Sequence, residues 1–178
     1  IRFVIVSNNY VNTNFRVLSN VKCITNLLLN YGSLPSMISQ LFISTYYFKI
    51  NKCDFVFAPG GIFLSRFKPF FTMSQNMLPF DSNSTVNFSI FKKIKFHLIK
   101  VLQLYSFNRS NGVVFLTEYA RRIISNKLSN KVKSIIIPHG ISQESHNNYR
   151  VKNDHFDILY ISDFLPYKNN FNVFIAVK

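Results

Sequence analysis

Short apolar runs alternate with amphipathic stretches along this chain. Runs bounded by turn-forming residues predict strands at residues 2–6, 53–58, 70–74, 112–116 and 134–137. Apolar residues at helical spacing predict helices over residues 36–47, over residues 86–107 and from Thr117 onward. Strands that alternate with helices indicate a parallel α/β sheet that is covered on both faces.

A polar stretch divides the chain into two unequal parts. Residues 142–154 have no apolar period and are typical of a linker. Beyond them, residues 157–162 predict a new strand, and residues 170–177 predict the beginning of a helix. We therefore expect a parallel α/β domain over residues 1–141, a linker over residues 142–154, and the first strand and helix of a second α/β domain over residues 155–178.

The long predicted helix is strongly basic on one part of its circumference and apolar on another. Its lysines cluster at Lys92, Lys93 and Lys95, with Lys100 further along. The apolar row consists of Phe88, Phe91, Ile94, Leu98, Val101, Leu102 and Tyr105. We expect this row to pack on the sheet as core, because the fold needs the helix there. The alternative is a basic module that docks on an anionic membrane or on nucleic acid.

The chain as a whole carries a large positive charge. The formal net charge of the 178 residues is +14, and 48% of the residues are hydrophobic. Nucleic acid, an anionic membrane surface or phosphate-bearing substrates would each suit such a charge, and so would a neutral coding bias toward Lys and Asn. Because the basic residues are spread along the chain, we do not expect a nucleic-acid partner.

The cysteines and the hydropathy pattern bear on location. Cys23 and Cys53 are isolated, so they form neither a disulfide framework nor a metal motif, which suits a reducing cytoplasm. The sequence has no secretory signal and no uncharged apolar run long enough to span a bilayer. We therefore expect a cytoplasmic protein that needs no metal cofactor.

Residues suited to ligand binding follow several predicted strands, where ligands bind in open α/β sheets. Gly60 and Gly61 follow the strand over residues 53–58; paired glycines let a backbone approach a ligand, although they also form ordinary turns. Gln75 and Asn76 follow the next strand and offer amides to a sugar hydroxyl, although Asn76 can also cap its own loop.

Four further candidate residues come later in the chain. Glu118 stands in the first turn of the helix that begins at Thr117. His139 and Gly140 stand at a strand tip, where a lone histidine is more often structural than catalytic. Lys168 lies in a loop that leads into a helix N-terminus, an arrangement that can cradle a diphosphate or can be an ordinary solvated lysine.

In this order, five segments resemble the large group of glycosyltransferases with the GT-B fold, the "glycosyl transferases group 1" type. The segments that carry the resemblance are residues 55–61, 75–80, 112–121, 136–141 and 158–162 followed by 167–169. The resemblance implies two Rossmann-like domains that face each other across a cleft. Residues 1–141 would be the acceptor-side domain, with its N-terminal part missing, and residues 155–178 would be the first strand and helix of the donor-binding domain. The resemblance also implies transfer of a sugar from a nucleotide-sugar donor to a glycan or lipid-linked acceptor of the cell envelope, at or near the inner face of the plasma membrane.

The resemblance also implies roles for individual residues. Lys168 matches the lysine that contacts the donor diphosphate, and Gly60 and Gly61 leave room for the donor phosphates or the acceptor. The cleft and acceptor candidates are Gln75, Asn76, Glu118, His139 and Gly140. Because a lysine, backbone N–H groups and a helix N-terminus can stabilise a leaving diphosphate, no metal is expected and the nucleotide-sugar is a substrate.

Three departures from the pattern affect the expected activity. Asp163 stands where many relatives have an arginine, so the diphosphate would meet an acidic residue in place of that arginine beside Lys168. Gln75 stands where many have a histidine, and an amide cannot relay a proton. The paired-glutamate motif of the group belongs deeper in the second domain than Lys178. We therefore expect this chain by itself to be inactive, and the sequence assigns no catalytic residue.

Overall fold

The computed structural model describes residues 1–15, 19–81, 83–86, 88–140, 160–162, 168 and 170–177. The first part of the chain contains β1 (Phe3–Ser7), α1 (Asn9–Phe15), β2 (Val21–Thr25), the short 3-10 helix η1 (Leu27–Asn30), α2 (Ser33–Phe42) and α3 (Ser44–Ile50). The rest contains β3 (Val56–Ala58), β4 (Phe70–Ser74), η2 (Leu78–Phe80), η3 (Asn83–Thr85), α4 (Ile90–Arg109), β5 (Gly112–Phe115), α5 (Glu118–Ser125), β6 (Lys133–Ile136) and α6 (Asn170–Val177).

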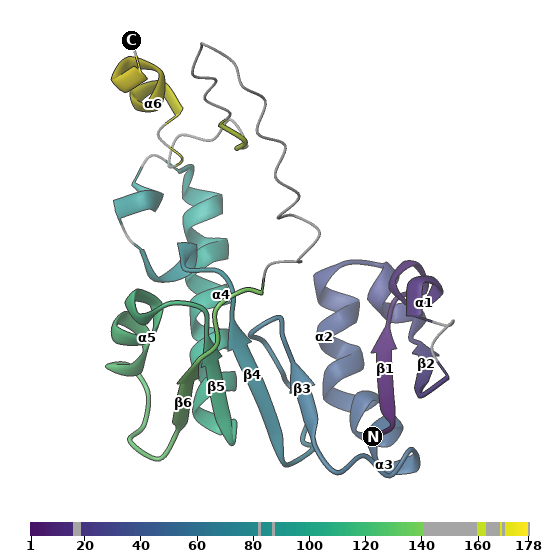
Figure 1. The fold of residues 1–178 in the computed structure, drawn as a ribbon. Coiled ribbons are helices and arrows are strands. Elements are labelled where there is room, and N and C mark those ends of the chain that lie inside the picture. The colour runs from purple at the N-terminus through teal and green to yellow at the C-terminus, as the bar shows by residue number, and fades with distance from the viewer. Residues whose placement is uncertain are drawn as a thin grey trace, which may run out of the picture.

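The strands form two parallel sheets (Figure 1). One sheet has four strands in the order β3-β4-β5-β6, and the other pairs β1 with β2. In the larger sheet Phe57 pairs with Phe71, Phe71 with Gly112, and Gly112 with Lys133. The α/β class and the parallel arrangement that the sequence predicts are therefore confirmed.

Several predicted boundaries differ from the structure. The predicted helix over residues 36–47 is two helices, because the backbone breaks at Ile43 between α2 and α3. The predicted helix over residues 86–107 begins later, at Ile90, and ends at Arg109. α1 and β2 were not predicted, because their Asn, Lys and Thr residues obscure the apolar pattern. The linker at residues 142–154 and the first half of the strand at 157–162 lie outside the described residues, and residues 160–162 are not in a strand.

The core lies on one face of the four-strand sheet. One cluster joins β5 to α4 and α5, and the other joins β3 and β4 to α3. The first consists of Phe80, Phe107, Val113, Phe115, Ala120 and Ile124, and the second of Phe48, Val56, Phe63, Phe67 and Phe70. In the view of Figure 1, α4 lies behind this sheet.

The opposite face of the four-strand sheet is not covered by the described elements. Residues alternate along β4, so that Phe70, Thr72 and Ser74 are buried while Phe71 is exposed. Phe57 on β3 and Ile135 on β6 are exposed as well. The expectation that helices cover both faces is therefore wrong for the described part of the chain, because the helices that build its two core clusters lie on one side.

The expectation that the apolar row of α4 forms core is also wrong. Phe91 is 81% exposed, and Ile94, Leu98, Val101 and Tyr105 are exposed too; Phe88 and Leu102 are half-buried. The residues that α4 buries are Gln103, Ser106 and Phe107.

The inner face of α4 is partly polar because it supports the segment between β3 and β4. The Oγ of Ser106 accepts a hydrogen bond from the backbone N–H of Phe63 at 2.9 Å. At the end of the helix, the Nη2 of Arg109 donates to the carbonyl oxygen of Ser65 at 3.1 Å. Backbone groups inside a protein need such partners, so polar residues take the inward positions.

Candidate functional site

The carboxyl edge of the four-strand sheet gathers most of the predicted site residues. Because β3, β4, β5 and β6 are parallel neighbours, their carboxyl ends lie at one edge. Each strand is followed there by candidate residues. They are Gly60 and Gly61 after β3, Gln75 and Asn76 after β4, Glu118 after β5, and His139 and Gly140 after β6.

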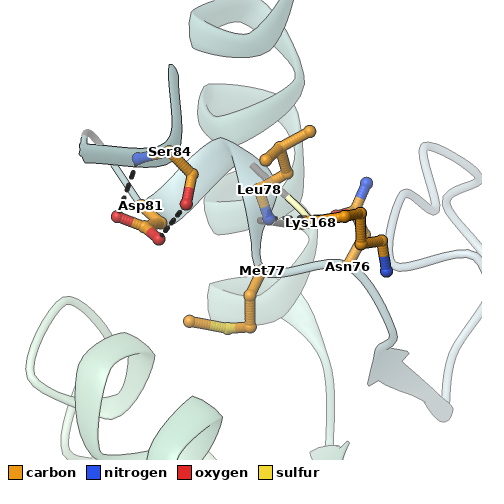
Figure 2. A pocket seen from close by; sticks show the side chains of 6 residues that line it. All are labelled: Asn76, Met77, Leu78, Asp81, Ser84 and Lys168. Carbon is orange, nitrogen blue, oxygen red and sulfur yellow. Dashed lines mark hydrogen bonds between the residues drawn. The ribbon is translucent and has the colours of Figure 1, made fainter. Parts of the chain in front are cut away.

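A pocket of about 250 Å³ lies where the chain leaves β4 (Figure 2). Its lining residues are Asn76, Met77, Leu78, Asp81, Ser84 and Lys168. Figure 2 shows Asp81 and Ser84 on one side of Met77, with Asn76 and Lys168 on the other side. The structure therefore brings together two predicted residues, Asn76 and Lys168, that are far apart in the sequence.

Asn76 shapes the loop as well as lining the pocket. Its Oδ1 accepts a hydrogen bond from the backbone N–H of Leu78 at 2.9 Å, which turns the chain into η2. This is the self-capping geometry that the sequence left open as an alternative. The neighbouring Gln75 is exposed, and its Nε2 lies 3.4 Å from the Sδ of Met73. Gln75 does not line the pocket.

Asp81 supplies a carboxylate to the pocket that the sequence analysis missed. Its Oδ2 accepts from the Oγ of Ser84 at 2.6 Å, and its Oδ1 accepts from the backbone N–H groups of Asn83 at 3.1 Å and Ser84 at 3.4 Å. The side-chain hydrogen bond from Ser84, with these backbone bonds, lowers the pKa of Asp81 below its ordinary value. The run Asp81-Ser82-Asn83-Ser84 consists of turn-forming residues and could have indicated this arrangement.

Lys168 is held near α6 through its backbone. The hydroxyl of Tyr160 shares its hydrogen bond between the carbonyl oxygen of Lys168 at 3.0 Å and the Oδ1 of Asn170 at 3.1 Å. The Oγ of Ser162 donates to the same Asn170 oxygen at 3.2 Å. These bonds fix Lys168 relative to the start of α6. Asp163, the predicted departure from the phosphate loop, lies outside the described residues.

The two glycines after β3 differ in their surroundings. Gly61 is buried with φ +78°, and an added Cβ would lie 2.8 Å from the Nε2 of Gln103 and 3.2 Å from the carbonyl oxygen of Met73. Glycine is therefore required at this position by the backbone and by packing. Gly60 is exposed, with nothing within 4 Å of an added Cβ, so it alone of the pair leaves open space at the strand end.

Two buried polar side chains near this turn were also missed by the sequence analysis. Ser74, at the end of β4, is 2% exposed, and Gln103 of α4 is 5% exposed. Neither the Oγ of Ser74 nor the Oε1 of Gln103 has a hydrogen-bond partner among the described residues. Gln103 was not predicted because the sequence assigned the opposite face of α4 to the core. Both atoms retain hydrogen-bonding capacity at the carboxyl edge.

The remaining candidates lie at the same edge but outside the pocket. Glu118 is exposed and forms an ion pair with Arg121, with its Oε2 at 3.0 Å from Nε and its Oε1 at 3.2 Å from Nη2. Thr117 caps this helix, since its Oγ1 accepts from the backbone N–H of Ala120 at 3.1 Å. His139 and Gly140 are exposed beyond β6, and neither lines the pocket.

Side chains that can ligate metals, and free thiols, are the remaining chemical groups to place. No group of three His, Cys, Asp or Glu side chains within it could hold a metal ion. Cys23 and Cys53 are free thiols. Burial raises the pKa of Cys53, with Arg2 opposing and Asp54 adding to the rise, so this thiol is a poor nucleophile near neutral pH.

No family model, no curated protein and no solved structure matches this chain. Within the described ranges, no helix is both long and apolar enough to cross a membrane.

Proposed function

We propose that this protein is part of a nucleotide-sugar-dependent glycosyltransferase, and that the pocket at the end of β4 receives the sugar-diphosphate portion of the donor. One observation carries the proposal. Asn76 and Lys168 stand in two separate segments that resemble GT-B glycosyltransferases, and both line this pocket. In this proposal the four-strand sheet belongs to a Rossmann-like acceptor-side domain, and α6 belongs to the donor-binding domain.

The two sides of the pocket suit the two chemical parts of such a donor. The ammonium group of Lys168 attracts the negative charge that develops on a leaving diphosphate. Asp81 is ionised and can accept hydrogen bonds from sugar hydroxyls, because each carboxylate oxygen has more than one acceptor site. We assign stabilisation of the leaving group to Lys168 and to backbone N–H groups without a metal ion.

The size of the pocket limits what it receives. Its volume of about 250 Å³ is below the range of roughly 300–1,000 Å³ that complete small-molecule sites occupy. We therefore assign it a part of the donor, with the base and ribose held elsewhere. The acceptor, a glycan or a lipid-linked saccharide, would approach along the carboxyl edge, where Gly60 leaves open space.

A binding experiment tests this proposal without requiring turnover. The chain is titrated with UDP, GDP and ADP by calorimetry, and the same titration is repeated with the Lys168→Ala variant. Because the pocket receives the diphosphate and not the base, we expect the three nucleoside diphosphates to bind with similar affinities. We expect the variant to bind them about tenfold to hundredfold more weakly, because a hydrogen bond to a charged group contributes about 1.5–3 kcal/mol.

The matched control is Lys127→Ala, which removes an exposed lysine outside the pocket. Binding to Lys127→Ala should equal binding to the unmodified chain. Equal affinities for all three proteins would remove Lys168 from the site, and no binding of any of the three nucleotides would overturn the proposal.

A further inference from the structure

The outer face of α4 presents a continuous apolar row to solvent. The exposed members of this row, which we call the α4 stripe, are Ile90, Phe91, Ile94, Leu98, Val101 and Tyr105. They recur at intervals of three and four residues, so they share one face of the helix. In Figure 1 the N-terminal half of α4 projects beyond the carboxyl ends of the strands behind which it runs.

Lysines border the α4 stripe on both sides. Successive residues of a helix are about 100° apart, so Lys93 and Lys95 fall on opposite flanks of Ile94. Both lysines are exposed. Lys100 lies two turns beyond Lys93 on the same flank. The sequence of α4 contains no Asp or Glu, so no acidic side chain of the helix offsets this charge.

We infer that α4 binds the surface of an anionic lipid bilayer and lies parallel to its plane. Helices of this kind place an apolar face among the acyl chains and lysines among the headgroups. The α4 stripe supplies the apolar face, Lys93 and Lys95 flank it, and the net charge of +14 favours an anionic surface. Nucleic acid fits this surface less well, since a phosphate backbone gives Phe91 and Ile94 no apolar environment.

The attachment would also position the pocket. Phe80 of η2 and Phe107 of α4 belong to one core cluster, and Leu78 of η2 lines the pocket. Because the loop after β4 is packed on α4 in this way, attachment of α4 to a bilayer would hold this loop at a fixed place relative to the membrane surface. The inference stands on the surface of α4 alone and does not depend on what the pocket binds.

Cosedimentation with lipid vesicles tests the inference. The chain is mixed with vesicles of phosphatidylcholine alone or of phosphatidylcholine with phosphatidylglycerol, and the bound fraction is measured. We expect binding to the anionic vesicles and little binding to the neutral ones. The double variant Lys93→Gln/Lys95→Gln should lower the partition coefficient about fivefold for each lysine removed. The double variant Phe91→Ser/Ile94→Ser should lower it about a hundredfold or more.

Two matched variants separate the α4 stripe from bulk properties of the chain. Lys127→Gln/Lys131→Gln removes the same charge from exposed positions elsewhere, and Leu34→Ser/Ile38→Ser removes exposed apolar side chains from α2. Both should bind anionic vesicles as the unmodified chain does. Circular dichroism should show that all four variants keep the helical content of the unmodified chain.

Several outcomes would overturn the inference. Equal loss of vesicle binding in the Lys127/Lys131 control would mean that net charge alone is responsible. Absence of binding to anionic vesicles, together with a dimer that the Phe91→Ser/Ile94→Ser variant converts to a monomer, would assign the α4 stripe to a second copy of the chain. Tight binding to duplex DNA that requires Lys93 and Lys95 but not Phe91 and Ile94 would assign the surface to nucleic acid.

Discussion

The helices α4 and α5 flank the same strand, yet they turn opposite kinds of face toward it. α5 buries Ala120 and Ile124 and keeps the ion pair between Glu118 and Arg121 outside. α4 buries two polar residues beside Phe107 and leaves its apolar row in solvent. Both helices show an amphipathic pattern in the sequence, but the pattern gives the packing direction correctly for only one of them.

The difference follows from what each helix packs against. α5 lies against the apolar side chains of β5, so aliphatic residues face inward. α4 also packs against the segment after Gly61, where the backbone N–H of Phe63 needs an acceptor and receives the Oγ of Ser106. Periodicity shows that a face prefers an apolar environment. It does not show whether the sheet or another surface provides that environment.

The largest expected contrast lies within α4 itself, between two phenylalanines. Phe107 is fully buried, so Phe107→Ala should lower the free energy of unfolding by about 3–5 kcal/mol. Phe91→Ala should change it by less than about 0.5 kcal/mol, because Phe91 makes little contact with the core. Urea denaturation of both variants measures the two values. A similar loss in both would mean that the exposed row is covered in solution.

A smaller change in the free energy of unfolding is expected when the polar inner face of α4 is altered. Ser106→Ala leaves the buried N–H of Phe63 without its acceptor and should cost about 1–3 kcal/mol in the free energy of unfolding. Ser89→Ala is the control, since Ser89 is exposed and its side chain makes no capping hydrogen bond. The same urea titration compares them. If Ser106→Ala is as stable as the control, the hydrogen bond does not explain the orientation of α4.

The smallest expected change in stability concerns the N-terminal caps of α4 and α5. Thr117 caps α5, and Thr117→Ala should lower the free energy of unfolding by about 1 kcal/mol because the N–H of Ala120 loses its partner. The equivalent position of α4 is Ser89, whose substitution by alanine should have no measurable effect. Thermal denaturation followed by circular dichroism distinguishes the two variants. Equal melting temperatures would argue against a capping role for Thr117.

The sequence predicts the parallel sheet well because its strands are compact apolar runs. β4 and β5 are bounded by turn-forming residues, and α5 begins at the capping residue that the sequence indicates. β2 was not predicted because Lys22 and Thr25 interrupt its run of apolar residues. The break between α2 and α3 at Ile43 has no Gly or Pro to signal it.

The candidate site was predictable only in pieces. The order of strands indicates that residues after β3 to β6 share an edge, so the positions of Gly60, Asn76 and Glu118 follow from topology. That Lys168 meets Asn76 in one pocket depends on how the chain returns after β6, which no local pattern contains. The resemblance to glycosyltransferases and the roles it implies remain predictions.

The uncovered face of the four-strand sheet affects the tendency of this protein to self-associate in solution. Phe57, Phe71 and Ile135 expose apolar side chains that favour association between copies of the protein. A net charge of +14 opposes this association by electrostatic repulsion. That repulsion extends about 10 Å at 0.1 M salt and only about 3 Å at 1 M salt. We therefore expect ionic strength to govern the colloidal stability of the protein, with self-association increasing as salt screens the charge.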